Sequence, residues 1–248
     1  MKFAALVAGI GMSLLAQAAQ AAEIRVFCTG AARAAYEKLA PQFEKATGHK
    51  LITHFALPTE LVRKLDAGDP VDAIILSFDI ERLIKQGKVT AGSRVVLGRT
   101  GVGVAIPQGA AKPDYSSADA LKQSLLKAKF IATSGEGSSG QYVLTLLDRL
   151  GIAAEVKPKI KSGASGQAAK LLAAREVDFA VIGLPPVANV AGVEWLGYLP
   201  DNLNSWLPFT GGVNVKAKEP DAAAALLKFL ITPAAVAVFK SKGLDPVQ

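Results

Sequence analysis

Cysteine and histidine are scarce in this chain of 248 residues, which has one cysteine and two histidines. A single cysteine, Cys28, excludes an internal disulfide, so the fold must rest on its packing. His49 and His54 flank one expected strand, and the sequence has no His-x-x-x-His spacing, cysteine pair or tight acidic cluster. Those are the arrangements that bind zinc or calcium, so we expect no metal site and no cofactor.

Aromatic residues make up only 6% of the chain, and no tract collects charge of one sign. Proteins that bind nucleic acid usually combine a basic face with aromatic side chains that stack on bases. Neither feature is visible here, which argues against a nucleic-acid partner. The formal net charge of +7 is spread along the chain and mildly favours an anionic ligand.

Long apolar runs are also missing, except for residues 3–16, which follow Lys2 at the start of the chain. This run is shorter than the ~20 residues that a membrane-spanning helix needs. A basic start, a short apolar run and a small-x-small triplet are typical of a secretory signal peptide. Cleavage is expected after Ala21, with Ala18 as a second option. We predict that residues 1–21 are removed and that the mature protein is periplasmic.

The remaining chain alternates between apolar strands and amphipathic helices. The first pair is the strand EIRVFC, residues 23–28, and the helix that follows it and ends at Gly48. Continuous apolar strands between such helices are typical of parallel sheets that are covered on both faces. The alternation is interrupted by a glycine-rich stretch over 98–117 and then starts again, with a further strand expected at 155–160. Two α/β lobes are therefore predicted.

Ligands of α/β sheets bind at the loops that follow the carboxyl ends of the strands. The loop TSGEGSSGQY, residues 133–142, lacks the lysine of a nucleotide P-loop and the Gly-x-Ser-x-Gly of a nucleophile elbow. It offers neutral hydroxyls and backbone amides ahead of a helix, which can hold an anion without neutralising it. The candidate ligand-binding residues in these loops are Thr29, Gly30, Thr59, Ser77, Thr133, Ser138, Ser139 and Gly140. Arg33, Arg63 and Arg99 are candidate carboxylate partners, because a guanidinium fork matches a carboxylate.

Several segments resemble one known family over the whole mature chain. They are EIRVFCTGAARAAYEKLAPQFEKATGHKL, LVRKLDAGDPVDAIILS, LIKQGKV and LLKFLITPAAVAVFKSKGLDP. Together they resemble the extracellular solute-binding proteins related to the periplasmic molybdate-binding proteins of ABC transporters. The resemblance implies a two-lobed type 2 periplasmic-binding-protein fold, with a mostly parallel sheet flanked by helices in each lobe and a ligand cleft between the lobes. It also implies that residues 22–105 form lobe 1, that 106–203 form lobe 2 and that 204–248 return to lobe 1.

The resemblance bears on the ligand and the partners as well. It implies that the protein, which we expect to be a monomer, clamps a small anion by hinge closure and delivers it to a membrane permease. Molybdate binders carry a serine, a serine-rich loop and a tyrosine where this chain has Ala31, Thr59 and Ile182. Each donor missing from a buried charged ligand costs about 1.5–3 kcal/mol, so we expect an organic acid rather than molybdate.

Two other functions stay open. The first is an isomerase of a small unsaturated carboxylic acid, of the aconitate isomerase kind, with Glu136 as general base and Glu60 or Asp79 as the other candidates. The second is a periplasmic sensor or partner-binding subunit that takes no part in transport. Cys28 falls at the end of the first expected strand, where a helix amino terminus could activate a thiol, but free cysteine is more often buried and inert.

Overall fold

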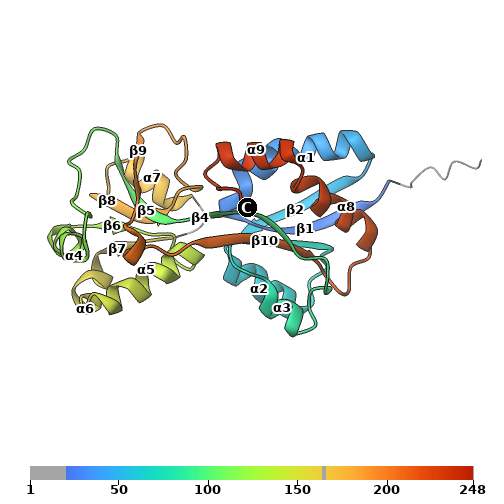
Figure 1. Cartoon of the computed structure of the whole chain (residues 1–248), viewed down its shortest axis with the longest axis horizontal. Helices are drawn as coiled ribbons and strands as arrows, with labels where there is room; N and C mark the ends of the chain where they lie inside the picture. The colour runs from blue at the N-terminus through green and yellow to red at the C-terminus, as the bar shows by residue number, and fades with distance from the viewer. Residues whose placement is uncertain (1–20, 164–165, 248) are drawn as a thin grey trace, which may run out of the picture.

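Two separate five-stranded sheets organise the chain into two lobes that lie end to end (Figure 1). The computed structural model describes residues 21–163 and 166–247. Apart from its last residue, the predicted signal peptide, 1–21, lies outside the described residues. The prediction of two α/β lobes is confirmed.

The first lobe has the strand order β2-β1-β3-β10-β4. Its strands are β1 (Glu23–Thr29), β2 (Lys50–Ala56), β3 (Ala73–Leu76), β4 (Val95–Thr100) and β10 (Leu207–Val213). Its helices are α1 (Arg33–Thr47), α2 (Pro58–Ala67), α3 (Glu81–Lys85), α8 (Pro220–Leu230) and α9 (Pro233–Ser241). α1, α8 and α9 cover one face of the sheet, and α2 and α3 cover the other (Figure 1).

β1 shows why this sheet needs helices on both faces. Ile24, Val26 and Cys28 are buried in the cluster that includes α1, α8 and α9, whereas Phe27 is buried in the cluster that includes α2 and α3. Successive residues of a strand point to opposite faces, so a strand without a polar face must be covered on both. Burial of each large apolar side chain contributes roughly 1.5–3 kcal/mol, which makes this strand a centre of the lobe.

The second lobe has the strand order β7-β6-β8-β5-β9. Its strands are β5 (Val102–Pro107), β6 (Ile131–Ala132), β7 (Ile160–Lys161), β8 (Phe179–Gly183) and β9 (Val193–Tyr198). Its helices are α4 (Ala118–Lys127), α5 (Ser138–Arg149), α6 (Ala153–Val156) and α7 (Gln167–Ala173). β1 pairs in parallel with β2 and β3, and β6 pairs in parallel with β7 and β8. The antiparallel pairs all involve β10 or β5, which each directly follow a crossing between the lobes.

The strand predicted over 155–160 is wrong for most of its length. These residues form the end of α6 and a 3-10 turn over Lys157–Lys159, and only Ile160 joins the sheet as the start of β7. Pro158 explains the difference, because proline has no amide hydrogen for a strand ladder and suits the first turn of a helix.

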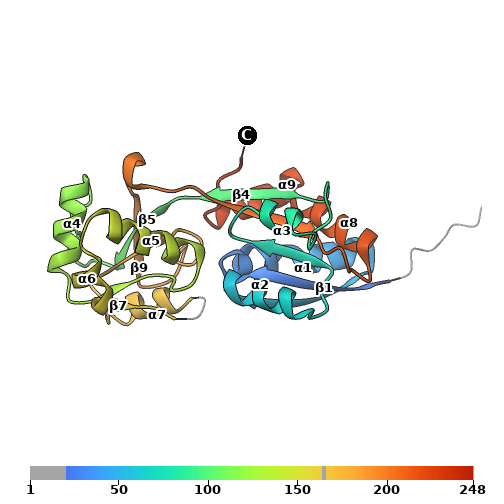
Figure 2. The ribbon, with the colours of Figure 1, turned by 90° about the horizontal axis from the view of Figure 1, so that it is seen from below.

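The chain crosses between the lobes twice, at Gly101 and over residues 199–206, and we call these two crossings the hinge (Figure 2). The first crossing precedes the boundary expected between residues 105 and 106. Asn204 joins the crossings, since its Oδ1 accepts a hydrogen bond from the Val102 amide at 2.8 Å. A side chain at Gly101 would lie 2.7 Å from Asn204 Nδ2, so the two crossings pack directly on each other.

The last residues return to the hinge and meet both lobes. Arg99 and Asp245 exchange two backbone hydrogen bonds, of 2.8 and 2.7 Å, so the chain end extends the edge of β4. Leu244 is buried in the core of the first lobe. Gly243 lies against Leu184 of the second lobe, where a methyl group on the glycine would be 2.6 Å from Leu184 Cγ.

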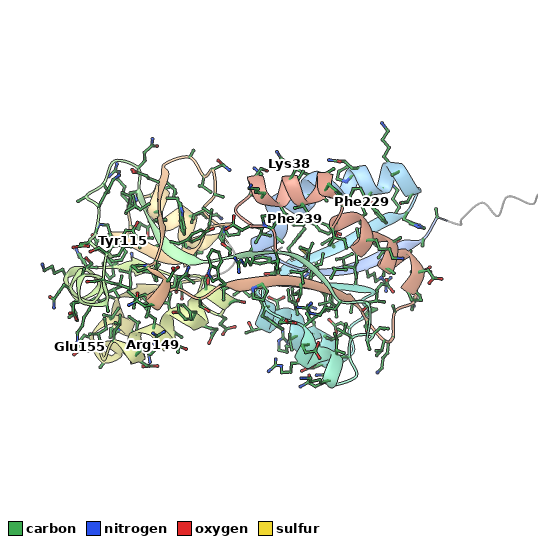
Figure 3. All side chains as sticks on the ribbon, viewed as in Figure 1. Lys38, Tyr115, Arg149, Glu155, Phe229 and Phe239 are labelled. Atoms are coloured by element: carbon green, nitrogen blue, oxygen red, sulfur yellow. The ribbon has the colours of Figure 1, made fainter. Side chains whose placement is uncertain are left out.

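No single helix within the described ranges is long and apolar enough to cross a membrane. α8 and α9 meet the length and composition requirement only as a pair, and they are bent by 65° at the break between them. Their apolar side chains pack into the first lobe, as Figure 3 illustrates for Phe229 and Phe239. The ring of Phe229 packs on that of Phe43 in α1, with centroids 5.6 Å apart.

Candidate functional site

A small cavity lies between the two lobes and has a volume of about 40 Å³. Ser77 and Ser138, from opposite lobes, lie within hydrogen-bond distance of each other at this cavity, so the lobes are nearly shut on each other. The hydroxyl side chains that line it are Thr29, Ser77, Thr100, Ser134, Ser138 and Ser139. Much of the remaining wall is apolar. It is formed by Ala31, Leu57, Pro58, Ala168, Ile182, Pro185, Pro186, Leu207 and Phe209, together with the glycines at 137, 166 and 183.

Thr29 and Ser77 bring the hydroxyls of the first lobe together. Thr29 ends β1 and Ser77 directly follows β3, its parallel neighbour, so both fall at the same edge of the sheet. Thr29 Oγ1 and Ser77 Oγ lie 3.4 Å apart, and both residues are buried. Gly30 starts a 3-10 turn that leads into α1, and Ala31 in this turn also lines the cavity.

The second-lobe hydroxyls are fixed by the loop ahead of α5. Ser134 Oγ accepts a hydrogen bond from the Gly140 amide at 2.7 Å and lies 2.8 Å from Ser139 Oγ. Thr133 Oγ1 accepts from the Gly135 amide at 3.2 Å, which uses this hydroxyl to shape the loop. The loop is therefore folded back on the first turn of α5, with Ser138 beside the cavity.

Gly140 permits this close packing because it has no side chain. A Cβ at this position would lie 2.1 Å from the carbonyl oxygen of Gly135, well inside any van der Waals contact. The glycine therefore acts through the backbone geometry of the loop. The structure places it behind the cavity wall, and its amide is taken up by Ser134.

Within the described ranges, two hydrogen bonds between side chains join the lobes across the cleft. Ser77 Oγ and Ser138 Oγ are 2.9 Å apart at the cavity itself. Thr59 Oγ1 donates to Glu136 Oε2 at 3.0 Å, and both of these residues lie outside the cavity lining. The first contact is partly buried and the second is exposed, so they mark the inside and the rim of the same cleft.

The candidate residues from the sequence divide into two groups. Those that line the cavity are Thr29, Ser77, Ser138 and Ser139, and those that do not are Gly30, Thr59, Thr133 and Gly140. Thr100 and Ser134 also line the cavity and were not among the candidate ligand-binding residues. Ser134 shares the loop of Ser138, which is a signal the sequence contains. Thr100 ends β4, which pairs antiparallel to β10. The expectation that ligands bind at the carboxyl ends of parallel strands therefore does not point to this residue.

Among the described residues that line the cavity, none carries a charge. The arginines proposed as carboxylate partners lie elsewhere, and two of them are stacked on aromatic rings. Arg33 Cζ lies 4.3 Å from the ring centroid of Phe55, and Arg99 Cζ lies 4.4 Å from that of Trp206. Positive potential in the cavity therefore comes from hydroxyl hydrogens and from the amino-terminal end of the α5 dipole.

The three carboxylates considered as general bases all have partners outside the cavity. Glu60 Oε1 lies 3.0 Å from His54 Nε2, and Glu136 accepts from Thr59. Asp79 is paired with the Arg94 guanidinium, whose hydrogen bonds hold the pKa of this carboxyl below its usual range. The part of the chain that the structure describes also contains no group of three or more histidine, cysteine or acidic side chains suited to a metal ion.

Cys28 is fully buried at the end of β1, beside Thr29. Burial raises the pKa of its thiol far above the usual value, which more than offsets the opposite effect of Arg33. A thiol in this environment stays protonated at neutral pH, so it has the properties of a core side chain.

Sequence comparison finds relatives with two kinds of activity. A profile of the family described as bacterial extracellular solute-binding protein matches residues 24–245. The molybdate-binding protein ModA of Azotobacter vinelandii is 32% identical over 247 residues, which cover 96% of this chain and 96% of that protein. The aconitate isomerase of Pseudomonas sp is 30% identical over 231 residues, which cover 90% of this chain and 88% of the isomerase.

A solved structure repeats the same architecture at lower identity. The periplasmic molybdate-binding protein of Azotobacter vinelandii superposes with a TM-score of 0.74 and 21% identity, and the match covers 91% of this chain and 100% of that one. At this level of identity the likeness shows a shared fold of two lobes.

Proposed function

Because this chain belongs to the bacterial extracellular solute-binding protein family, we propose that it captures a small organic anion in the periplasm and delivers it to the permease of an ABC transporter. The observation that carries this proposal is the cavity between the lobes, where neutral hydroxyls from both sides meet without a charged side chain. Such a cavity can hold an anion by hydrogen bonds and release it without breaking an ion pair.

The wall of the cavity favours an organic acid over a tetrahedral oxyanion. The hydroxyls can take up a carboxylate, and the apolar wall around Leu57, Ile182 and Phe209 suits a hydrocarbon body. Molybdate exposes oxygen on all sides, so some of its oxygens would face apolar groups, and each unmade hydrogen bond costs about 1.5–3 kcal/mol. Ala31 and Ile182, which stand where molybdate binders have hydroxyl groups, both belong to this wall.

Closure of the lobes would be driven by the ligand itself. Ser77 and Ser138 come from opposite lobes, and in their mutual hydrogen bond only one of the two hydroxyl hydrogens is used. A carboxylate between them would accept both hydrogens, so it binds the closed form more tightly than the open one. A ligand shifts an equilibrium by its difference in affinity for the two states, and this difference would bring the lobes together.

A thermal-shift screen tests the proposal, with acetate, crotonate, fumarate, trans-aconitate, sulfate and molybdate as probes. We expect a carboxylate to raise the unfolding temperature and the two oxyanions to leave it unchanged. A shift with molybdate alone would overturn the preference for organic acids. The absence of a shift with every anion would overturn anion binding as such.

Isomerisation is the second candidate, and the 30% identity to an aconitate isomerase favours it. The partners of Glu136, Glu60 and Asp79 outside the cavity argue against it, since a general base must reach the proton that it abstracts. Incubation with trans-aconitate and analysis of the products by proton NMR separates the two functions. We expect unchanged substrate, whereas turnover that is lost in Glu136→Gln would identify an enzyme.

A further inference from the structure

An acidic side chain stands at the rim of a cleft that is otherwise lined by hydroxyl and apolar groups. Glu136 belongs to the loop between β6 and α5, two residues ahead of Ser138 in the cavity lining. It is exposed, and no ion pair to it is found among the described residues. A negative charge in this place is unfavourable for the anion that the cleft is proposed to bind.

Thr59 keeps this charge at the rim. Its hydroxyl donates to Glu136 Oε2 at 3.0 Å, and it lies in the first turn of α2, in the opposite lobe. The bond joins the two lobes, so it fixes the carboxylate where the lobes meet when they are together. Threonine is a neutral donor and leaves the charge of Glu136 uncompensated, which a lysine or arginine in its place would not do.

The cavity has little with which to offset a high ligand charge. Its described lining contains no cation, and the amides at the start of a helix amount to about half a positive charge. Each additional negative charge on the ligand therefore meets repulsion from Glu136 without a matching attraction. Because Glu136 is exposed, salt screens part of this repulsion, so its effect on binding is largest at low ionic strength.

We infer that Glu136, positioned by Thr59, is a charge filter that makes the cleft select singly charged organic acids over di- and trivalent ones. The inference rests on the proposed function, since it concerns the ligands of the same cleft. It assigns to Glu136 a role in specificity, which requires only that its charge lies near the bound anion. The general base role considered from the sequence would instead require contact with the ligand.

The variant Glu136→Gln tests the filter, because glutamine keeps an oxygen acceptor for Thr59 and removes the charge. Crotonate, fumarate and trans-aconitate carry one, two and three carboxylates and serve as probes in isothermal titration calorimetry. We expect wild-type protein to bind crotonate most tightly. In Glu136→Gln the affinity should rise by about threefold to tenfold for each negative charge on the ligand, so the gain is smallest for crotonate and largest for trans-aconitate.

Two further variants serve as comparisons. Thr59→Val removes the donor and frees the carboxylate, so it should relax the selectivity in the same direction but by less. Glu155→Gln removes a carboxylate at the far end of the second lobe, labelled in Figure 3, and should change none of the three affinities. Far-ultraviolet circular dichroism and the unfolding temperature show that each variant is folded.

The possible outcomes distinguish the filter from the proposed function. An equal change of all three affinities in Glu136→Gln, or no change, would overturn the filter and leave anion binding intact. Tightest binding of trans-aconitate by wild-type protein would do the same. If neither wild-type nor variant protein bound any of the three acids, both the filter and the proposed function would be overturned.

Discussion

Ser77 and Ser138 belong to different lobes, yet their hydroxyl oxygens lie 2.9 Å apart in the cleft. Ser77 follows the central parallel strand of the first lobe, and Ser138 opens α5 in the second. Neither position is unusual in its own lobe, since hydroxyl residues are common at strand ends and helix starts. Their approach across the cleft is what makes them a pair, and it couples ligand contacts to the positions of the lobes.

Removal of either hydroxyl should weaken anion binding. A hydrogen bond to a charged group contributes about 1.5–3 kcal/mol, so Ser77→Ala and Ser138→Ala should each raise the Kd for crotonate by about tenfold to a hundredfold. Titration calorimetry measures the effect. Ser241→Ala is the matched control, because this serine lies on α9 and its hydroxyl donates to the carbonyl of Val238 in the same helix. Unchanged affinity in both cleft variants would show that the ligand does not sit between these hydroxyls.

Gly140→Ala should damage the loop that presents Ser138. Its Cβ would lie 2.1 Å from the Gly135 carbonyl oxygen, so the loop must shift. Overpacking of this kind costs about 1–3 kcal/mol, and we expect a lower Tm together with weaker crotonate binding. Gly183→Ala is the comparison for Tm alone, because this glycine lines the cavity and its Cβ would meet Thr100 Cγ2 at an ordinary 3.4 Å. Equal losses of Tm in the two variants would contradict the steric explanation.

The native protein should resist thiol reagents. The raised pKa of Cys28 keeps the protonated form dominant at pH 8, where an exposed thiol is already partly ionised, and burial blocks access as well. We expect no reaction with Ellman's reagent under native conditions and one thiol per chain in guanidinium chloride. Rapid labelling of the folded protein would show that the end of β1 opens readily.

The end of the chain should stabilise both the first lobe and the hinge. A chain that ends at Gly243 loses buried Leu244 and the two backbone hydrogen bonds between Arg99 and Asp245. These losses predict a decrease of about 2–4 kcal/mol in the free energy of unfolding, measured with guanidinium chloride. Small-angle scattering should also show a larger radius of gyration, because the lobes open more freely.

A chain that ends at Asp245 retains all of these contacts and is the control for the shorter one. It should match the full-length protein in unfolding free energy and in radius of gyration. If the two truncated chains behaved alike, the pairing of Arg99 with Asp245 would have no part in the hinge.

Local patterns predicted much of the fold. The strand at residues 23–28 was recognisable because its apolar residues continue without a polar face. The end of α1 was recognisable because Gly48, with a φ of 76° that suits glycine, caps the helix after Thr47. The strand expected at 155–160 failed because Pro158 outweighed the apolar pattern around it. Local preference thus predicts an element well where all of its residues agree, and poorly where one residue opposes the rest.

The site was predictable only in part, because some of its residues come together through contacts between segments that are distant in the sequence. Thr29 and Ser77 could be placed at one edge because parallel strands align their carboxyl ends. Thr100 lies on a strand whose antiparallel partner, β10, comes more than a hundred residues later in the chain, so no local pattern marks it. Thr59 and Glu136 each looked like candidates for ligand contact or catalysis, and the structure instead places them together at the rim.

By itself, the sequence determined two α/β lobes and a set of neutral hydroxyls at strand ends. It also predicted an export signal. These depend on apolar periodicity and on the chemistry of single residues, both of which are local. Only the tertiary structure decided which hydroxyls share the cavity, that no described lining residue is charged, and that Glu136 meets Thr59. Those relations depend on how the two crossings set one lobe against the other, and contacts between distant segments leave no pattern in the local sequence.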